Sequence, residues 1–370
     1  MRLNFLFKIF AILFVATFLS NCSSKTENIP EDIAINDFVW KGLNAYYLWQ
    51  SSKPDLADTR FSNQNELNAY LTNFATPEET FEAHLLRPTD RFSIIVDDYI
   101  ALENAFQGIT LNNGMEFGLV RNKTNTSNVF GYVRYVIPNS DAALNGVSRG
   151  MIFSEINETP LTDTNFSGLL SGNSYTIGLA DYNNGDPIAN GNSITLTKSQ
   201  LTENPVKIAK IFEEGMGNKI GYLMYNQFSV AFDGELNAAF ATFNNENITD
   251  LIVDLRYNGG GSVRTATYLG AMITGQFNNE VFSKQVWNEK AMDAWPSENF
   301  INRFTNQINN GNISQTINSL NLQRVFFITS GSSASASELV INSLRPYIDV
   351  IMIGTKTVGK QVGSITLYDS

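Results

Sequence analysis

From residue 207 to the end of the chain, β-forming stretches alternate with stretches of helical periodicity. This alternation constrains the fold more than any other feature of the sequence. Strands are expected at residues 219–225, 250–256, 325–328 and 350–354. Helices are expected between them, at residues 233–244 and 263–274. Such an order predicts an α/β core with a mostly parallel sheet. Functional sites in such folds form in loops at the carboxyl ends of the strands.

Two further regions precede this core. At 370 residues the chain is too long for one ordinary domain. Residues 33–107 carry apolar side chains at helical spacing and predict a helical N-terminal cap that ends in a strand at 90–96. Residues 108–202 carry short alternating strands with Gly and Asn turns, which predicts a β-rich domain. With the core over residues 203–370, the chain is expected to be a multidomain α/β (α+β) protein.

Charge and histidine content exclude several classes of function. The formal net charge of −11 argues against a nucleic-acid partner and against anionic membrane surfaces. The chain contains one histidine, His84, which lies in the expected cap. A Ser-His-Asp triad and a multi-histidine metal site are therefore both excluded. We expect a site with no metal and no cofactor.

The N-terminus has the features of an export signal. Arg2 and Lys8 precede an apolar run of eleven residues, which is too short to span a bilayer. Residues 1–21 are thus expected to be a signal peptide. Cys22, the only cysteine, follows in a context that resembles a bacterial lipobox, although Asn21 stands where Gly or Ala is usual. We expect Cys22 to be lipidated, residues 22–32 to be a linker, and the protein to be anchored in the bacterial cell envelope, on the periplasmic side or in the outer membrane. Chance placement of the cysteine is the alternative.

Residues 330–340 read SGSSASASELV and directly follow an expected strand. Two interpretations are open. Ser335 and Glu338 fit a capping box, in which the serine only begins a helix. A serine on a strand-to-helix turn also lies exposed at the edge of a sheet, beside helix N–H groups that stabilise negative charge. That is the usual place for a nucleophile.

Two glycine-bearing loops follow other strands of the expected core. Residues 254–261 read DLRYNGGG, and three glycines in a row indicate either a flexible turn or a close approach of the backbone. Residues 354–360 satisfy G-x-x-x-x-G-K, but Gln361 stands where a phosphate-binding loop needs Ser or Thr. Residues 362–367 also have the pattern of a strand instead of a helix. A nucleotide site is therefore rejected. If Ser335 is a nucleophile, its base cannot be a histidine of the core, and a lysine can serve where burial favours its neutral form.

The segments DLRYNGGG, GSSASASELV and TVGK, in this order, resemble the C-terminal processing (tail-specific) serine peptidases. The resemblance runs from about residue 90 to the end. It implies that Ser335 is the nucleophile, that Lys360 is the general base, and that the N–H groups of Ala336 and Gly260 form the oxyanion hole. A glutamine commonly lies four residues after the lysine in this family, but here that residue is Ser364. The family's core normally continues further, so we expect the core over 203–370 to be incomplete.

The β-rich region resembles a PDZ domain, with strands expected at 117–120, 131–137 and 151–157 and a short helix that stops before Gly146. The resemblance implies that an extended peptide adds to the strand that contains Phe117, Gly118 and Leu119. Met151 and Glu158 stand where PDZ domains usually have Asp and Gly, so the fold follows more firmly than the ligand.

Together these resemblances imply an exported, lipid-anchored serine endopeptidase with a Ser/Lys dyad. Its substrates would be unfolded or C-terminally exposed polypeptides. The alternative is a non-catalytic peptide-binding lipoprotein whose peptidase core is degenerate or truncated. The sequence indicates no oligomeric state.

Overall fold

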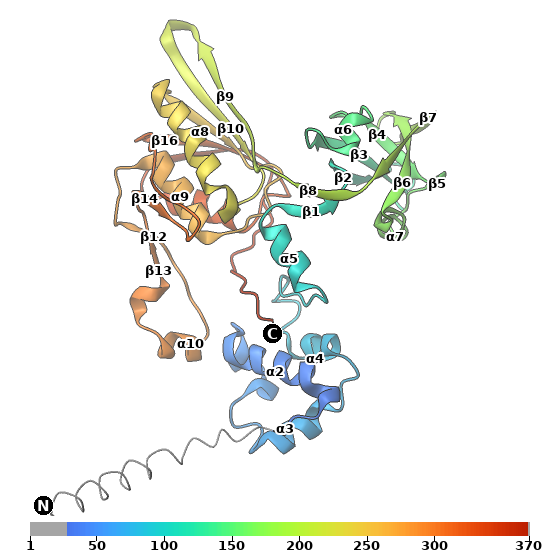
Figure 1. Ribbon diagram of the computed structural model, residues 1–370, viewed down its shortest axis with the longest axis vertical. Coiled ribbons are helices and arrows are strands. Elements are labelled where there is room, and N and C mark those ends of the chain that lie inside the picture. Colours follow the sequence, from blue (N-terminus) through green and yellow to red (C-terminus); the bar gives the residue numbers. More distant parts are fainter. Residues whose placement is uncertain (1–27, 369–370) are drawn as a thin grey trace, which may run out of the picture. The chain divides into compact units, whose positions relative to one another are not determined.

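The computed structural model describes residues 28–368 (Figure 1). The expected signal peptide and Cys22 lie outside these residues. The described chain divides into two compact units, one formed by residues 28–95, 286–296 and 365–368, the other by residues 96–285 and 297–364. No helix within residues 28–368 is long and apolar enough to cross a bilayer.

The first unit is helical, as the sequence predicts. Its main helices are α2 (Ala34–Tyr46), α3 (Gln64–Leu71) and α4 (Pro77–His84). Asn63 caps α3 and Thr76 caps α4, each by accepting a backbone N–H three residues further on. The expected strand at 90–96 is wrong. The Asp90 carboxylate instead accepts the N–H groups of Phe92 and Ser93, which closes a turn.

Two segments that the sequence assigns to the core belong to this helical unit. One contains α10 (Glu289–Ala294). Its N-cap, Asn288, also donates side-chain hydrogen bonds to the carbonyls of Ala45 and Tyr47, at 2.9 and 3.2 Å, at the C-terminal end of α2. The other segment is the end of the chain, where Leu367 lies against Gly42 of α2. Local sequence patterns carry no signal for such long-range assembly.

The second unit contains an antiparallel sheet in the order β2-β3-β4-β6-β7, with β5 paired to β4. The bounds are β2 Met115–Arg121, β3 Val129–Val136, β4 Ile152–Ile156, β5 Thr159–Pro160, β6 Ser174–Asp181 and β7 Ile188–Thr197. Helices α6 (Asp141–Leu144) and α7 (Phe166–Ser171) accompany it. Strand β2 is an edge strand and pairs only with β3.

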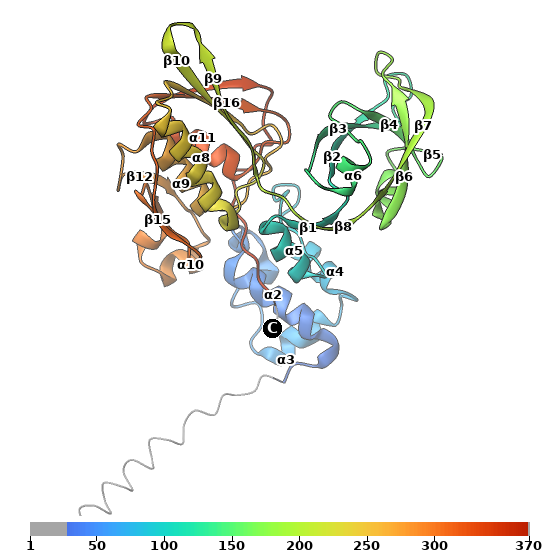
Figure 2. The same ribbon diagram turned by 45° about the horizontal axis from the view of Figure 1, so that its top comes forward.

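Short elements join this β-rich region to the rest of the unit. Helix α5 (Tyr99–Phe106) precedes it, and strand β1 (Ile109–Asn112) pairs antiparallel with β8 (Ser199–Thr202). The chain therefore enters and leaves the β-rich region along one two-stranded ribbon (Figure 2).

The α/β core contains a five-stranded sheet in the order β17-β16-β11-β10-β9. Strands β10, β11, β16 and β17 are parallel, and β9 pairs antiparallel with β10. The bounds are β9 Val206–Glu214, β10 Asn218–Tyr225, β11 Asp250–Asp254, β16 Arg324–Thr329 and β17 Asp349–Gly354. The predicted mostly parallel sheet is confirmed. Residues 355–368 form no strand, so the strand expected at 362–367 is wrong.

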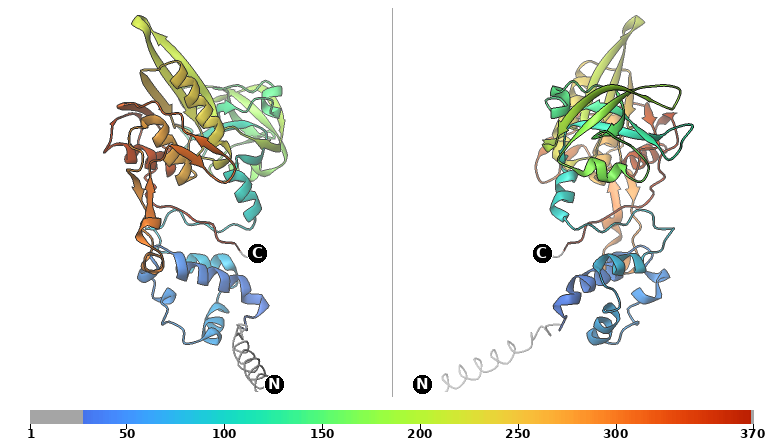
Figure 3. Two further views of the ribbon diagram at one scale, coloured as in Figure 1. Left: turned by 60° about the vertical axis from the view of Figure 1, so that its left-hand side comes forward. Right: turned by 90° about the vertical axis from the view of Figure 1, so that its right-hand side faces the viewer.

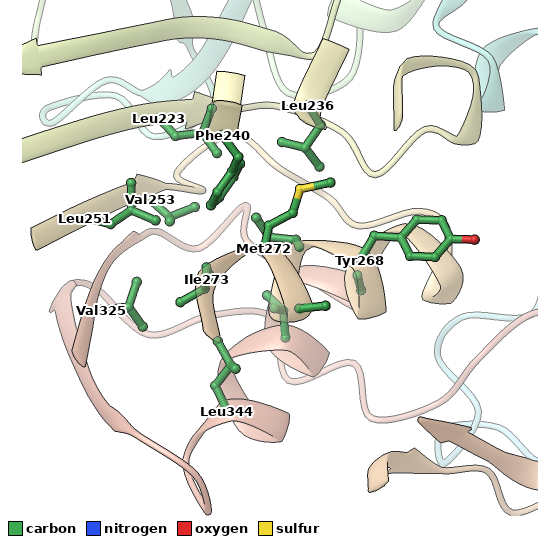
Figure 4. Close-up of a cluster of buried hydrophobic side chains, with 14 of the residues drawn as sticks. Leu223, Leu236, Phe240, Leu251, Val253, Tyr268, Met272, Ile273, Val325 and Leu344 are labelled. Carbon is green, nitrogen blue, oxygen red and sulfur yellow. The ribbon is translucent and has the colours of Figure 1, made fainter. Parts of the chain in front are cut away.

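Helices α8 (Asp233–Asn245), α9 (Val263–Thr274) and α11 (Ala336–Leu344) pack on this sheet. Figure 4 shows Leu251, Val253 and Val325 of the strands facing Phe240 of α8 and Met272 of α9. All five side chains are buried. Two small hairpins complete the unit, β12 (Val281–Lys284) with β13 (Ile301–Arg303) and β14 (Gln307–Asn309) with β15 (Ser314–Thr316).

Candidate active site

Ser335 lies between β16 and α11, on the strand-to-helix turn that the sequence predicts. Its backbone has φ 56° and ψ −114°, so it occupies the left-handed side of conformational space, which a non-glycine residue rarely adopts. Such a conformation costs about 1–3 kcal/mol and persists only where surrounding contacts impose it. Ser335 is partly exposed, whereas Ala336, the first residue of α11, is buried.

The other serines of SGSSASAS fasten this turn to the loop after β11. Ser333 Oγ donates to the carbonyl of Leu255 at 2.7 Å, and Ser337 Oγ donates to that of Asn258 at 3.0 Å. Both serines are fully buried. The serine-rich composition therefore has a structural cause, because small donors are needed where two loops pack closely.

Asn258 organises the glycine loop from a fully buried position. Its side chain donates to the carbonyl of Tyr225 at 2.9 Å and accepts the N–H of Gly260 at 2.8 Å. A side chain at Gly260 would place Cβ 2.7 Å from Cβ of Ser335, and φ there is 109°. The glycine is thus required for the close approach of the two loops, and the flexible-turn interpretation is wrong.

The amide of Gly260 is already used by Asn258 and is not presented to an oxyanion. The carbonyl of Gly260 accepts the N–H of Phe228 at 2.9 Å. In a trans peptide the N–H points opposite to the C=O, so the N–H of Gly261 points away from Phe228. Within residues 28–368 no acceptor is found for the N–H of Gly261 or of Ala336. Sequence alone could not choose among three consecutive glycines, and the structure adds Gly261 as a candidate donor.

Glu338 links the serine turn to the lysine loop. Its Oε2 accepts the backbone N–H of Ser335 at 2.9 Å and of Lys360 at 2.8 Å. Its Oε1 accepts Thr357 Oγ1 and the N–H of Gly359, both at 2.6 Å. Burial opposes ionisation, but these four donors outweigh it and hold the pKa of Glu338 below its ordinary value. The predicted capping box of Ser335 and Glu338 is present, and its carboxylate also binds the lysine loop.

Lys360 is half-buried, and burial lowers the pKa of its ammonium group. Its Nζ donates to Ser364 Oγ at 3.3 Å. Ser364 thus occupies the place that the family resemblance gives to an orienting glutamine. The lysine loop is also tied to the serine turn by the N–H of Val358, which donates to the carbonyl of Ser333 at 3.0 Å.

An ion pair between buried Asp254 and partly exposed Arg256 stabilises the start of the glycine loop. Both oxygens of Asp254 accept from Nε of Arg256 at 3.0 Å, and Tyr222 donates to Oδ2 at 2.7 Å. Burial opposes ionisation of Asp254, but these donors hold its pKa below the usual range. The sequence singled out DLR as a motif without indicating this role.

The other candidate residues belong to other elements of the fold. Phe117, Gly118 and Leu119 are on edge strand β2 of the β-rich sheet, and Gly118 packs against the ring of Tyr132. His84 is buried in the helical unit, where Nδ1 lies 2.6 Å from the carbonyl of Thr80. Within residues 28–368 no cluster of His, Cys, Asp and Glu could hold a metal ion.

The α/β core thus carries a strained serine at a strand-to-helix turn, and Glu338 links its amide to that of a half-buried lysine. Peptidase family S41 matches residues 219–367, and the peptidase S41 N-terminal domain matches residues 34–94. The chain belongs to peptidase family S41.

Known relatives support this assignment. The chain is 27% identical over 184 residues to a probable CtpA-like serine protease of Staphylococcus epidermidis. The aligned region covers 48% of this chain and 34% of that protein. The chain thus spans about a third of the length of the curated relatives it matches. A crystal structure of an S41 protease from Bacteroides fragilis is similar at a TM-score of 0.64 and 26% identity, over 88% of this chain and 79% of that one. The photosystem II D1 C-terminal processing protease shares the fold, at a TM-score of 0.51 and 16% identity over 90% and 83% of the two chains.

Proposed function

We propose that this chain is a serine endopeptidase in which Ser335 attacks the peptide carbonyl and Lys360 is the general base. The observation that carries the proposal is the shared acceptor, since one oxygen of Glu338 binds the amides of both residues. A residue that only capped a helix would need no such link to a half-buried lysine. The lowered pKa of Lys360 favours the neutral amine that a base requires.

In the proposed reaction, Ser335 Oγ forms a bond to the carbonyl carbon as neutral Lys360 takes its proton. The N–H groups of Ala336 and Gly261 stabilise the oxyanion, in place of the Ala336 and Gly260 pair implied by resemblance. As the C–N bond breaks, Lys360 gives the proton to the leaving amine, and an acyl-enzyme ester on Ser335 Oγ remains. Water attacks the acyl-enzyme by the same route and releases Ser335.

The substrate class we propose is an unfolded or C-terminally exposed polypeptide, docked on a PDZ-like β-rich domain. Edge strand β2 pairs on one side with β3, which leaves its other side for an added peptide strand next to Phe117, Gly118 and Leu119. If the region only acts as a spacer, deleting residues 108–202 will leave selectivity among peptides with different C-termini unchanged.

We also propose that the protein is an exported lipoprotein, acylated at Cys22 and held in the bacterial cell envelope. Cys22→Ala should yield an unprocessed or soluble form. A mature-sized mutant that still partitions into the membrane would contradict this proposal.

The peptidase proposal is tested by hydrolysis of an unstructured reporter peptide by the wild type, Ser335→Ala and Lys360→Arg. We expect cleavage by the wild type alone. The alternative, a non-catalytic peptide-binding lipoprotein, predicts that the folded wild type binds the reporter without cleaving it and that neither substitution changes the result.

A further inference from the structure

Strand β9 forms an exposed edge of the core sheet. It pairs with β10 on one side only, and the β9-β10 hairpin projects beyond α8 (Figures 1 and 3). Ile208 and Phe212 are large apolar residues on this strand, and they are 41% and 44% exposed. An exposed edge strand with apolar side chains is a template for pairing with another chain.

The charges on this strand have an unusual arrangement. Lys210, Phe212 and Glu214 alternate along β9 and therefore share one face, where Lys210 Nζ lies 5.0 Å from the Phe212 ring. In the part of the chain that the structure describes, no ion pair involves Lys210 or Glu214. Glu213, on the other face, lies opposite Lys219 of β10.

Geometry restricts how two copies of β9 could pair. In an antiparallel ladder, two opposite residues either both direct their N–H and C=O groups toward the other strand or both direct them away. Neighbouring residues of one strand alternate in this direction, so residue i of one copy cannot lie opposite residue i+1 of the other. The two-fold axis of a symmetric pair must therefore pass through a residue that lies opposite itself. An axis at Lys210 would place like charges opposite each other, which is destabilising. An axis at Ile211 would place Lys210 opposite Phe212 and form no ion pair.

An axis at Phe212 satisfies the part of the face from Lys210 to Glu214. Phe212 then lies opposite Phe212 of the second copy, and each Lys210 lies opposite a Glu214. We propose that two copies of this chain associate through antiparallel β9 strands in this register, joining their two sheets into one. The two unpaired charges of each chain become cross-strand ion pairs, and the exposed phenylalanine becomes an aromatic pair.

The test uses the full chain with Cys22→Ser, which removes the only cysteine, in sedimentation velocity in mild detergent. We expect a concentration-dependent dimer. Lys210→Glu and Glu214→Lys should each weaken dimerisation by roughly tenfold, since both pairs become like-charged. The double variant, Lys210→Glu with Glu214→Lys, should recover it. Glu235→Lys, an exposed site on α8 with the same charge change, is the matched control and should dimerise normally.

Cysteine pairs check the register independently. In the Cys22→Ser background, Phe212→Cys should form a symmetric disulfide, because directly opposite Cβ atoms lie about 4.5–5.5 Å apart. Lys210→Cys and Glu214→Cys should crosslink when mixed and much less when alone. A monomeric wild type at about 100 µM, a double charge variant no better than the singles, or a dimer without the Phe212→Cys disulfide would each overturn the proposal.

Discussion

The backbone amides of Ser335 and Lys360 donate to the same carboxylate oxygen, Oε2 of Glu338. The shared acceptor thereby holds the backbone nitrogens of two residues that are 25 positions apart in the sequence close together. Ser335 has a strained backbone conformation, and its hydrogen bond to the carboxylate helps to stabilise that conformation. Glu338 is therefore expected to act as a positioning residue for both proposed catalytic groups.

Glu338→Gln should reduce both stability and rate. The amide NH₂ would face donors that now bond to a carboxylate oxygen, and we expect a loss of about 2 kcal/mol in the free energy of unfolding. Hydrolysis should fall at least roughly tenfold because the serine turn and the lysine loop lose their link. Urea unfolding and kcat measure the two effects. An unchanged rate would show that the link has no part in catalysis.

Acid should weaken the same link. The pKa of Glu338 is lower in the folded state than in the unfolded chain. The ionised carboxylate therefore contributes stability that is fully present above the unfolded pKa and is lost as pH falls through the folded pKa. We expect the difference in unfolding free energy between wild type and Glu338→Gln to shrink as the solution is acidified. A difference that does not change with pH would contradict the assignment.

The serines of the turn should separate by role. Ser335→Ala should abolish hydrolysis, whereas loss of its N-cap should cost only about 1 kcal/mol of stability. Ser333→Ala and Ser337→Ala should each cost about 1 kcal/mol of stability, because each removes one of the two donors to a carbonyl in the buried loop contact, and should retain measurable activity. If Ser335→Ala retained the wild-type rate and only lost stability, helix capping would be its whole role.

Lys360 should set the pH dependence of the reaction. Burial lowers its pKa, and a base acts only when neutral, so kcat/KM should rise with pH until Lys360 is deprotonated. Lys360→Arg should remove activity as completely as Lys360→Ala, because arginine keeps its proton. A variant Lys360→Arg that still cleaves at a substantial rate would eliminate the lysine base.

Ser364 should orient that base. Ser364→Ala removes the acceptor 3.3 Å from Nζ, and we expect a several-fold lower kcat with KM nearly unchanged. The pH profile should also shift, since the amine loses a hydrogen-bond partner. Ser364→Gln restores an acceptor of the kind common in the family and should recover much of the rate. Equal rates for all three proteins would remove Ser364 from the site.

Most of the core could be predicted because its signals are local. Helix α9 begins and ends at the predicted residues, Val263 and Thr274, since Ser262 caps its start and Gly275 ends it. The strand-to-helix turn at Ser335 has a local signal of the same kind, whereas the role of Lys360 was implied only by the family resemblance. Each is marked by residue types within a short stretch of chain.

The remaining features depend on contacts between distant segments. The N–H of Gly260 donates to Asn258, which leaves the N–H of Gly261 as the candidate oxyanion donor. This difference depends on the direction of the backbone, and the pattern of side chains does not encode it. Likewise, Asn288 reaches the end of α2 across more than two hundred residues. The strand expected at 362–367 was wrong because the last residues of this segment belong to the helical unit, where Leu367 lies against Gly42 of α2.

The measurement that tests the central claim most directly is labelling of the folded full chain with a fluorophosphonate, followed by peptide mapping. A serine activated by Lys360 should form a covalent adduct at Ser335 alone, faster as pH rises, and Lys360→Arg should prevent it. Absence of an adduct in folded wild-type protein, or equal labelling of wild type and Lys360→Arg, would contradict the Ser335–Lys360 mechanism.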